Sequence, residues 1–327
     1  MKNILLVNEC YCDGKPLLGF SNSRHNLINT FLQTQPQYNL FTIHIDEAAI
    51  TYETHVNNIL PKYCKKHKID AIVFCLLGRS KYNPSNKTYK QLKNQGIYTI
   101  FIWPDTGPEY GIGTIAKLGK LADLHVSFDN PTSPFHDTVK FADNHLRLWV
   151  PQDKLLYFNQ LNKDIPASFI GSTANRERIA YLNCLKTTYP ELLVMGGQRE
   201  SRKLSYTQYA ELIRRSKINI NFSVSLAAFF QTKGRIFEVL ASGSMLLESK
   251  NPSTATLFTP NKDYVEFNSP DELVEKIKYY LSHEEERVKI AEQGHQTYLA
   301  RYTAKHFWDA VMTRAESDTN PNKLKSL

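Results

Sequence analysis

The feature that most constrains the fold is the alternation of short, continuously apolar runs with longer amphipathic stretches. Strands are expected at 3–8, 38–45, 70–77, 97–103 and 124–128, and helices near 23–33, 51–67, 85–95 and 112–121. Strands that are apolar along their whole length are buried on both faces, which is typical of a parallel sheet covered by helices on both sides. The first half is therefore predicted to be a doubly wound α/β domain.

The same alternation begins again in the second half of the chain. Strands are expected at 168–171, 191–197, 218–221, 244–248 and 263–267, and helices near 175–187, 205–215, 234–241 and 270–281. Segment 150–166 contains Pro151 and Pro166 and has no strong periodicity, so it is the predicted linker. A chain of 327 residues also exceeds the usual size of one core, so two similar domains are expected.

The last part of the chain, 284–317, is strongly helical, with expected breaks near Gly294 and around Tyr302. Residues 317–327 lack the apolar content to pack and are predicted to be a frayed tail. The expected domains are 1–155, 156–303, and a C-terminal helix with its tail at 304–327 that can pack back on the first domain.

Composition limits the possible partners and compartments. The formal net charge of +8 attracts an anionic partner such as a nucleotide, a nucleic acid or a lipid head group. No apolar run reaches the roughly 18 residues of a membrane-spanning helix, so a chain without a transmembrane segment is expected. The five cysteines are scattered and odd in number, which favours reduced thiols and a cytoplasmic location.

Metal signatures are weak in this sequence. Cys10 and Cys12 could ligate a metal, but two small apolar residues at a strand end are the favoured interpretation. The sequence contains no Asp-x-Asp pair, HExxH or CxxC motif, so no metal site is predicted.

The segment FFQTKGRIFEVLASG is predicted to bind a phosphate ester. A helix that begins near Gly234 would present backbone N–H groups of Thr232, Lys233 and Gly234 to an anion, and Lys233 and Arg235 would add positive charge. Glu238 lies one turn further along, where a carboxylate can accept the hydroxyls of a ribose, and the nearby cations are expected to keep it ionised. The alternative is an ion pair between Arg235 and Glu238 on the helix surface.

A family resemblance appears in the same region. The order RIFEVLASGSMLLES, then DYVEF, then DELVEKI resembles the C-terminal half of the GT-B nucleotide-sugar glycosyltransferases, especially their CgeB-like, spore-coat branch. The motifs cover about 168–303, and the first half is similar in architecture. The resemblance implies a GT-B fold, that is, two Rossmann-like doubly wound parallel-sheet domains facing a central cleft.

The resemblance also implies further contacts to a sugar-nucleotide donor. Gly171 and Ser172 would approach the diphosphate, Arg176 would neutralise it, and Gly196 and Gly197 would let the backbone approach the base. A solvent-facing arginine at position 176 and an ordinary turn at the two glycines are the alternatives.

One position departs from the larger retaining group of this fold, in which two glutamates are separated by seven residues. Glu238 matches the second glutamate, and Phe230 stands where the first would be. This difference keeps open a non-catalytic module that binds sugar nucleotides.

Candidates for the acceptor side lie in the first half. YTIFIWPDTGP resembles the segment that CgeB-like proteins place at the mouth of the cleft, so Asp105 is expected to orient or deprotonate the acceptor hydroxyl. Asp13 is the second candidate and His25 the third. Each could instead be an ordinary capping residue.

The predicted function is transfer of a hexosyl or pentosyl group from a nucleoside diphosphate sugar to an acceptor hydroxyl. A UDP-sugar is the first candidate for the donor. The acceptor would be a glycan, a protein or a small molecule, and the resemblance implies a retaining reaction without a metal ion or another cofactor. The alternative acceptor is DNA, as in phage enzymes of this fold that glycosylate hydroxymethylated bases, since the net charge of +8 also suits a nucleic acid.

Overall fold

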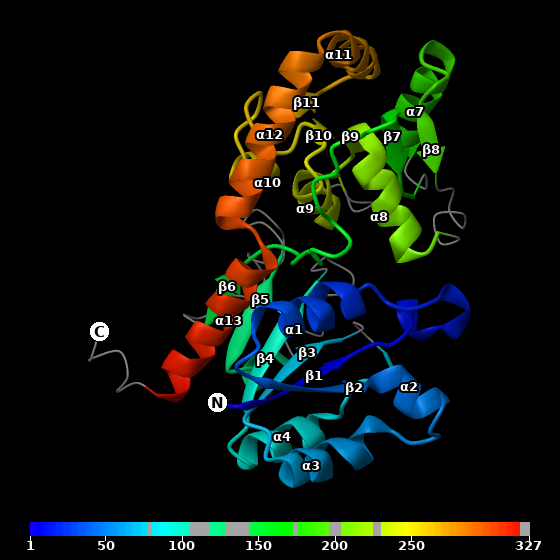
Figure 1. Cartoon of the computed structure of the whole chain (residues 1–327). Helices are drawn as coiled ribbons and strands as arrows, with labels where there is room; N and C mark the ends of the chain where they lie inside the picture. The colour runs from blue at the N-terminus through cyan, green and yellow to red at the C-terminus, as the bar shows by residue number, and fades with distance from the viewer. Residues whose placement is uncertain are drawn as a thin grey trace. The chain divides into compact units, whose positions relative to one another are not determined.

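The computed structural model describes residues 1–76, 80–104, 118–128, 144–172, 176–195, 204–224 and 230–320. The chain forms two compact units (Figure 1). The N-terminal unit consists of Met1–Pro151 together with Ala304–Leu327, and the C-terminal unit of Gln152–Thr303. No helix among the described residues is long and apolar enough to cross a membrane.

The N-terminal unit is built on a six-stranded parallel sheet of order β2-β1-β3-β4-β5-β6. Its strands are β1 (Asn3–Asn8), β2 (Asn39–His44), β3 (Ala71–Cys75), β4 (Tyr98–Trp103), β5 (Leu124–Ser127) and β6 (His145–Arg147). Its helices are η1 (Cys12–Gly14), η2 (Pro16–Leu18), η3 (Arg24–Asn29), α1 (Thr30–Thr34), α2 (Ile45–Ile50), α3 (Val56–His67), α4 (Asn86–Asn94), η4 (Gly119–Leu121) and α13 (Ala304–Thr319).

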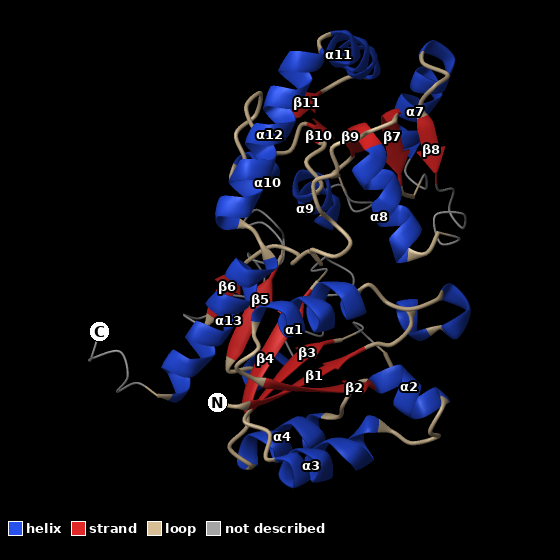
Figure 2. Ribbon diagram, in the orientation of Figure 1, coloured by secondary structure: helices blue, strands red, loops and turns tan. Residues whose placement is uncertain are grey.

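Both faces of this sheet are covered by helices (Figure 2). Alternate residues of β1 point to opposite faces: Leu5 and Val7 join the core under α3 and α4, whereas Ile4 and Leu6 join the core under α1 and α13. All four side chains are fully buried. This two-sided burial explains why the strands are apolar along their whole length.

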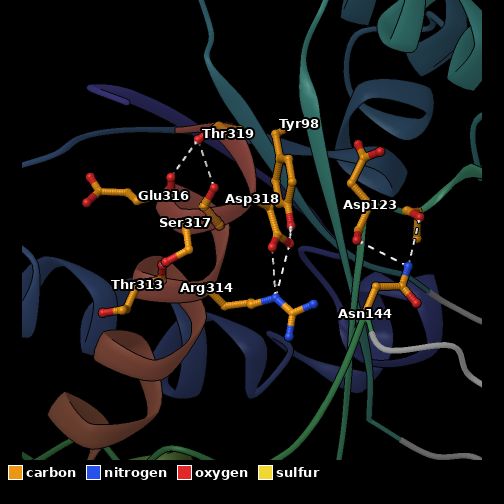
Figure 3. A network of polar contacts seen from close by, with 11 residues as sticks. Tyr98, Asp123, Asn144, Thr313, Arg314, Glu316, Ser317, Asp318 and Thr319 are labelled. Carbon is orange, nitrogen blue, oxygen red and sulfur yellow. Dashed lines mark hydrogen bonds and ion pairs between the residues drawn. The ribbon is translucent and has the colours of Figure 1, made fainter. Parts of the chain in front are cut away.

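The C-terminal helix α13 is fixed to the N-terminal unit by polar and apolar contacts. Trp308 is fully buried, and its Nε1 donates to Thr30 Oγ1 at 2.9 Å. Near the helix end, Asp318 accepts from Tyr98 Oη at 2.5 Å and from Arg314 Nε at 2.9 Å (Figure 3). Residues from the far end of the sequence therefore complete the core that β1 begins.

The C-terminal unit is built on a five-stranded parallel sheet of order β11-β10-β9-β7-β8. Its strands are β7 (Ile165–Ile170), β8 (Leu193–Met195), β9 (Ser216–Asn221), β10 (Met245–Ser249) and β11 (Val265–Phe267). Its helices are α7 (Arg176–Thr188), α8 (Tyr206–Arg215), α9 (Gly234–Ala241), α10 (Pro252–Ala255), α11 (Pro270–Ser282) and α12 (Glu284–Arg301).

The predicted doubly wound architecture is confirmed in both units. Two elements, α2 and β6, were not predicted from the sequence. α2 follows β2 directly without turn residues, and β6 is a three-residue edge strand without an apolar run. The expected helix at 112–121 lies largely outside the described residues.

The expected break near Gly294 is wrong, because α12 runs through this residue from Glu284 to Arg301. The helix ends at the second expected position, since Tyr302 is its C-cap. Gly294 is needed for packing rather than for a turn. A Cβ atom at this position would lie 2.2 Å from the carbonyl oxygen of Asp263 and 2.8 Å from Leu240 Cδ2.

Substitution Gly294→Ala is expected to destabilise the protein by roughly 1–3 kcal/mol, because the added methyl group meets backbone. Helix propensity alone predicts the opposite sign, a gain of about 1 kcal/mol. Urea unfolding measures the difference, with the exposed Gln296→Ala on the same helix as the control. A Gly294→Ala variant as stable as the wild type would contradict the close packing.

Candidate functional site

The carboxyl end of β7 and the start of α9 carry most of the predicted binding residues. β7 ends at Ile170 and Gly171 follows it, while α9 begins at Gly234 with Lys233 as N-cap. Within the described part of the chain no side chain caps this helix end, so the backbone N–H groups of its first turn are available to an anion. Thr232 Oγ1 is buried there and has no hydrogen-bond partner among the described residues.

Arg235 packs directly over Gly171. A Cβ atom built on Gly171 would lie 2.7 Å from Arg235 Nη2 and 3.0 Å from Nη1. The guanidinium carbon also lies 5.5 Å from the centre of the Phe169 ring. Glycine is therefore required after β7 for close approach of the guanidinium, and both residues belong to the predicted set.

A second guanidinium, that of Arg178, lies against the same ring and was missed by the sequence analysis. Its Cζ is 5.6 Å from the centre of Phe169 and 5.5 Å from that of Phe222. Its Nη1 donates to the carbonyl oxygen of Ser172 and its Nη2 to that of Phe222 at 3.4 Å. Its Nε is buried without a hydrogen-bond partner in the described part of the chain.

The two guanidinium groups repel one another. Burial and, to a smaller extent, the positive charge of Arg235 together lower the pKa of Arg178 to about 10. An anion bound between two like charges removes this repulsion and accepts charge-assisted hydrogen bonds from both. The arrangement is therefore suited to a phosphate or diphosphate group.

Glu238 and Arg235 are joined through Tyr209 of α8. Tyr209 Oη donates to Glu238 Oε2 at 2.6 Å and accepts from Arg235 Nε at 3.2 Å. Burial raises the pKa of Glu238, and this effect outweighs the lowering by Arg235 and by the hydrogen bond from Tyr209. Burial therefore opposes the expected effect of the nearby cations, which is to keep this carboxylate ionised.

A cavity of 340 Å³ borders this site at the carboxyl ends of β9, β10 and β11. Its lining includes Arg178, Tyr181, Phe222, Phe230 and Phe267. Such a cavity beside an anion site suits a ligand that has both a charged and an uncharged part.

Several predicted residues are not settled by the structure. Asp105, Gly196 and Gly197 lie outside the described residues. Arg176 opens α7, but its side chain is also outside the described part. Their roles stay predictions.

The other two candidates belong to the N-terminal unit. Asp13 is exposed and has a left-handed backbone with φ 52°. His25 lies on η3, where its Nδ1 contacts Asn29 Nδ2 at 3.2 Å. Among the described residues, those lining the 660 Å³ cavity of this unit do not include Asp13 or His25.

A buried glutamate belongs to the hydrogen-bond network that holds the segment before α9. Glu248, at the end of β10, is fully buried and accepts hydrogen bonds from Ser223 Oγ, Thr254 Oγ1 and Asn251 Nδ2. Asn251 Nδ2 also donates to the carbonyl oxygen of Gln231 at 3.1 Å. The network thereby fixes the segment that leads into α9.

Burial raises the pKa of Glu248 to about 7, so the protonated form favours the folded state. This contribution is complete below the usual value of 4.5 and is lost as the pH rises through 7. The unfolding free energy of the wild type relative to Glu248→Gln should therefore fall by up to roughly 3 kcal/mol over that range. Urea unfolding at several pH values measures it.

The control for this prediction is Glu275→Gln, which changes an exposed glutamate on α11. The difference in unfolding free energy between this control and the wild type should be nearly constant with pH. If the difference between Glu248→Gln and the wild type is also constant with pH, the raised pKa of Glu248 is contradicted.

Comparison with protein families supports the interpretation of the second half. Residues 156–313 match the family model described as glycosyl transferase-like. Comparison with curated protein sequences gave no match.

Solved structures of glycosyltransferases are similar over nearly the whole chain. Anabaena Alr3699/HepE in complex with UDP and glucose has a TM-score of 0.65 and 10% identity, covering 96% of this chain and 100% of that chain. A glycosyltransferase from Rickettsia africae has a TM-score of 0.66 and 11% identity, covering 97% and 98%.

A third structure is an alpha-glucosyltransferase in complex with UDP and a DNA 13-mer containing an HMU base. Its TM-score is 0.64 with 11% identity, covering 96% of this chain and 100% of that chain. Likeness at such low identity establishes the fold. The chain therefore has the GT-B fold, and its residues 156–313 match the glycosyl transferase-like family model.

Proposed function

We propose that this protein is a glycosyltransferase that moves a sugar from a nucleoside diphosphate sugar to an acceptor hydroxyl. The observation that carries the proposal is the pair of guanidinium groups, Arg178 and Arg235, beside Gly171 and the open N-terminus of α9. UDP is the first candidate nucleotide, because two of the similar structures are described as complexes with UDP.

In this proposal the diphosphate lies between the guanidinium groups of Arg178 and Arg235. The backbone after β7 and the first turn of α9 donate further hydrogen bonds. The hydroxyl of Thr232, which has no hydrogen-bond partner among the residues that the structure describes, supplies another, and Lys233 adds positive charge. We also propose that Arg176 would neutralise the diphosphate and that Gly196 and Gly197 would let the backbone approach the base.

Glu238 would accept hydrogen bonds from the hydroxyl groups of the ribose. Tyr209, which donates a hydrogen bond to Glu238, holds the carboxylate in place and links it to Arg235. The sugar would extend toward the cavity that Phe230 lines, where the larger retaining group has a glutamate. An aromatic side chain at this position contacts the sugar by packing instead of hydrogen bonding.

The reaction would break the bond between the anomeric carbon and the phosphate oxygen and form a bond to the acceptor oxygen. Negative charge develops on the departing diphosphate, and Arg178, Arg235 and the α9 dipole stabilise it in place of a metal ion. In a retaining reaction the departing phosphate oxygen takes the proton of the acceptor hydroxyl.

The acceptor side is assigned to the N-terminal unit. Asp105 would orient the acceptor hydroxyl, with Asp13 and His25 as the other candidates. A cell-surface glycan, a protein or a small molecule is the acceptor that membership of the CgeB-like branch would imply. A DNA acceptor is tested by a gel shift on duplex containing hydroxymethylated bases, and no binding at about 50 mM salt excludes it.

UDP is expected to raise the melting temperature of the wild-type protein, and calorimetry should give one site. Arg178→Ala and Arg235→Ala should each weaken UDP binding by roughly tenfold to 100-fold, as expected for the loss of charge-assisted hydrogen bonds of about 1.5–3 kcal/mol. The exposed Arg301→Ala on α12 is the matched control. If UDP, GDP, CDP and TDP all fail to stabilise the protein, the donor site is refuted.

Gly171→Ala should weaken UDP binding by about tenfold, since the added Cβ would displace the Arg235 guanidinium from a contact at 2.7 Å. The fold should be retained, because the displaced atoms are the end of a flexible side chain. Calorimetry and thermal unfolding separate the two effects. An unchanged UDP affinity would show that Arg235 does not bind the nucleotide from this position.

Turnover distinguishes an enzyme from a module that only binds sugar nucleotides. Slow hydrolysis of labelled UDP-glucose, abolished in Glu238→Ala, would support the enzyme. Tight binding without hydrolysis or transfer to any acceptor would favour the module.

A further inference from the structure

Three metal-ligating side chains meet at the edge of the N-terminal sheet. Cys10 follows β1, His44 ends β2, and Glu47 lies in the first turn of α2. One ligand atom from each residue lies within 4.8 Å of the others, and all three side chains are partly buried. They also line the 660 Å³ cavity of this unit.

The backbones of two of these residues are fixed by one buried carboxylate. Asp46 Oδ1 accepts from the backbone N–H of Cys10 at 2.7 Å and from that of Glu47 at 3.0 Å. Its Oδ2 accepts from the backbone N–H of Tyr11 at 2.9 Å. Asp46 is fully buried, so the loop after β1 and the start of α2 are held in one arrangement.

The third residue, His44, is oriented by Asn8, its partner in the parallel pairing of β1 and β2. Asn8 Nδ2 donates to Ser23 Oγ at 2.7 Å and to the carbonyl oxygen of Glu9 at 3.0 Å. Its Oδ1 therefore faces His44 Nδ1, at 2.9 Å, and accepts the proton of that nitrogen. The lone pair of the imidazole is then on Nε2, as in histidines that bind metals with an outer hydrogen bond.

We propose that Cys10, His44 and Glu47 bind a divalent transition-metal ion of the zinc type. Thiolate, imidazole and carboxylate are the ligands that Zn²⁺ prefers, and the two negative charges match its positive charge. Tetrahedral zinc would bring the ligand atoms to about 3.5 Å from one another, which requires a movement of about 1 Å. The fourth position faces the cavity and is open to water or to a ligand.

This site is independent of the proposed nucleotide site, because all of its residues belong to the N-terminal unit. The sequence separation of its ligands also explains why no sequence motif predicts this site. Cys10 and His44 are far apart in sequence and become neighbours only because β1 pairs with β2. A metal ion bound by Cys10, His44 and Glu47 is compatible with a transfer reaction that needs no metal, since the metal site and the nucleotide site use different residues.

The test is titration of the full-length, metal-free protein with Co²⁺ and competition by Zn²⁺. The wild type should bind one Co²⁺ with the sulfur-to-cobalt charge-transfer band of a thiolate ligand. Cys10→Ser should abolish the band, and Glu47→Gln should weaken binding at least tenfold. Asn8→Leu, which removes the partner of His44, should weaken binding by roughly 10-fold to 100-fold.

Cys12→Ser is the matched control, because Cys12 lies two residues from Cys10 but its Sγ donates to the carbonyl oxygen of Phe20 at 3.2 Å. This variant should keep the band and the affinity. Wild-type protein provides a test that needs no variant: Zn²⁺ should protect Cys10, but not Cys12, from alkylation, as mapped by mass spectrometry. Absence of saturable Co²⁺ or Zn²⁺ binding, or equal protection of both cysteines, would overturn the proposal.

Discussion

The packing of two guanidinium groups against Phe169 is the interaction on which the candidate site depends. Arg178 and Arg235 come from α7 and α9 and lie over the same ring, although their charges repel. Two carbonyl oxygens accept hydrogen bonds from Arg178, and Tyr209 accepts one from Arg235. In the proposed function an anion would add further partners, and this connects the fold of the C-terminal unit with the proposed chemistry.

The rigidity of this arrangement comes from polar groups buried beneath it. Glu248 and Asn251 connect the ends of β9 and β10 to the segment before α9, and every one of these groups is removed from water. Buried polar networks are costly unless their members are hydrogen-bonded. Glu248 Oε1 accepts several hydrogen bonds, whereas Glu248 Oε2 has no partner among the described residues. The position of the α9 N-terminus is therefore set by β10 as well as by its own sequence.

Periodicity and turn residues were sufficient to predict both sheets, apart from the short edge strand β6, and the bounds of α9, Gly234–Ala241. The partners of the site residues were not predictable, because they depend on how separate elements pack. Arg178 was missed because its packing against Phe169 and Phe222 depends on the tertiary structure. The role of Arg176 stays a prediction. Tyr209 lies on α8 and Asn8 on β1, far in sequence from the groups that they orient.

The assignment of α13 to the N-terminal unit has a consequence for biosynthesis. Translation delivers β1 before the C-terminal unit and α13 after it. Until α13 has been made, the surface formed by Ile4, Leu6 and Phe31 has no Trp308 to cover it. The N-terminal unit is thus completed only after the C-terminal unit has been synthesised, and the nascent chain exposes in the meantime an apolar face of the kind that chaperones bind.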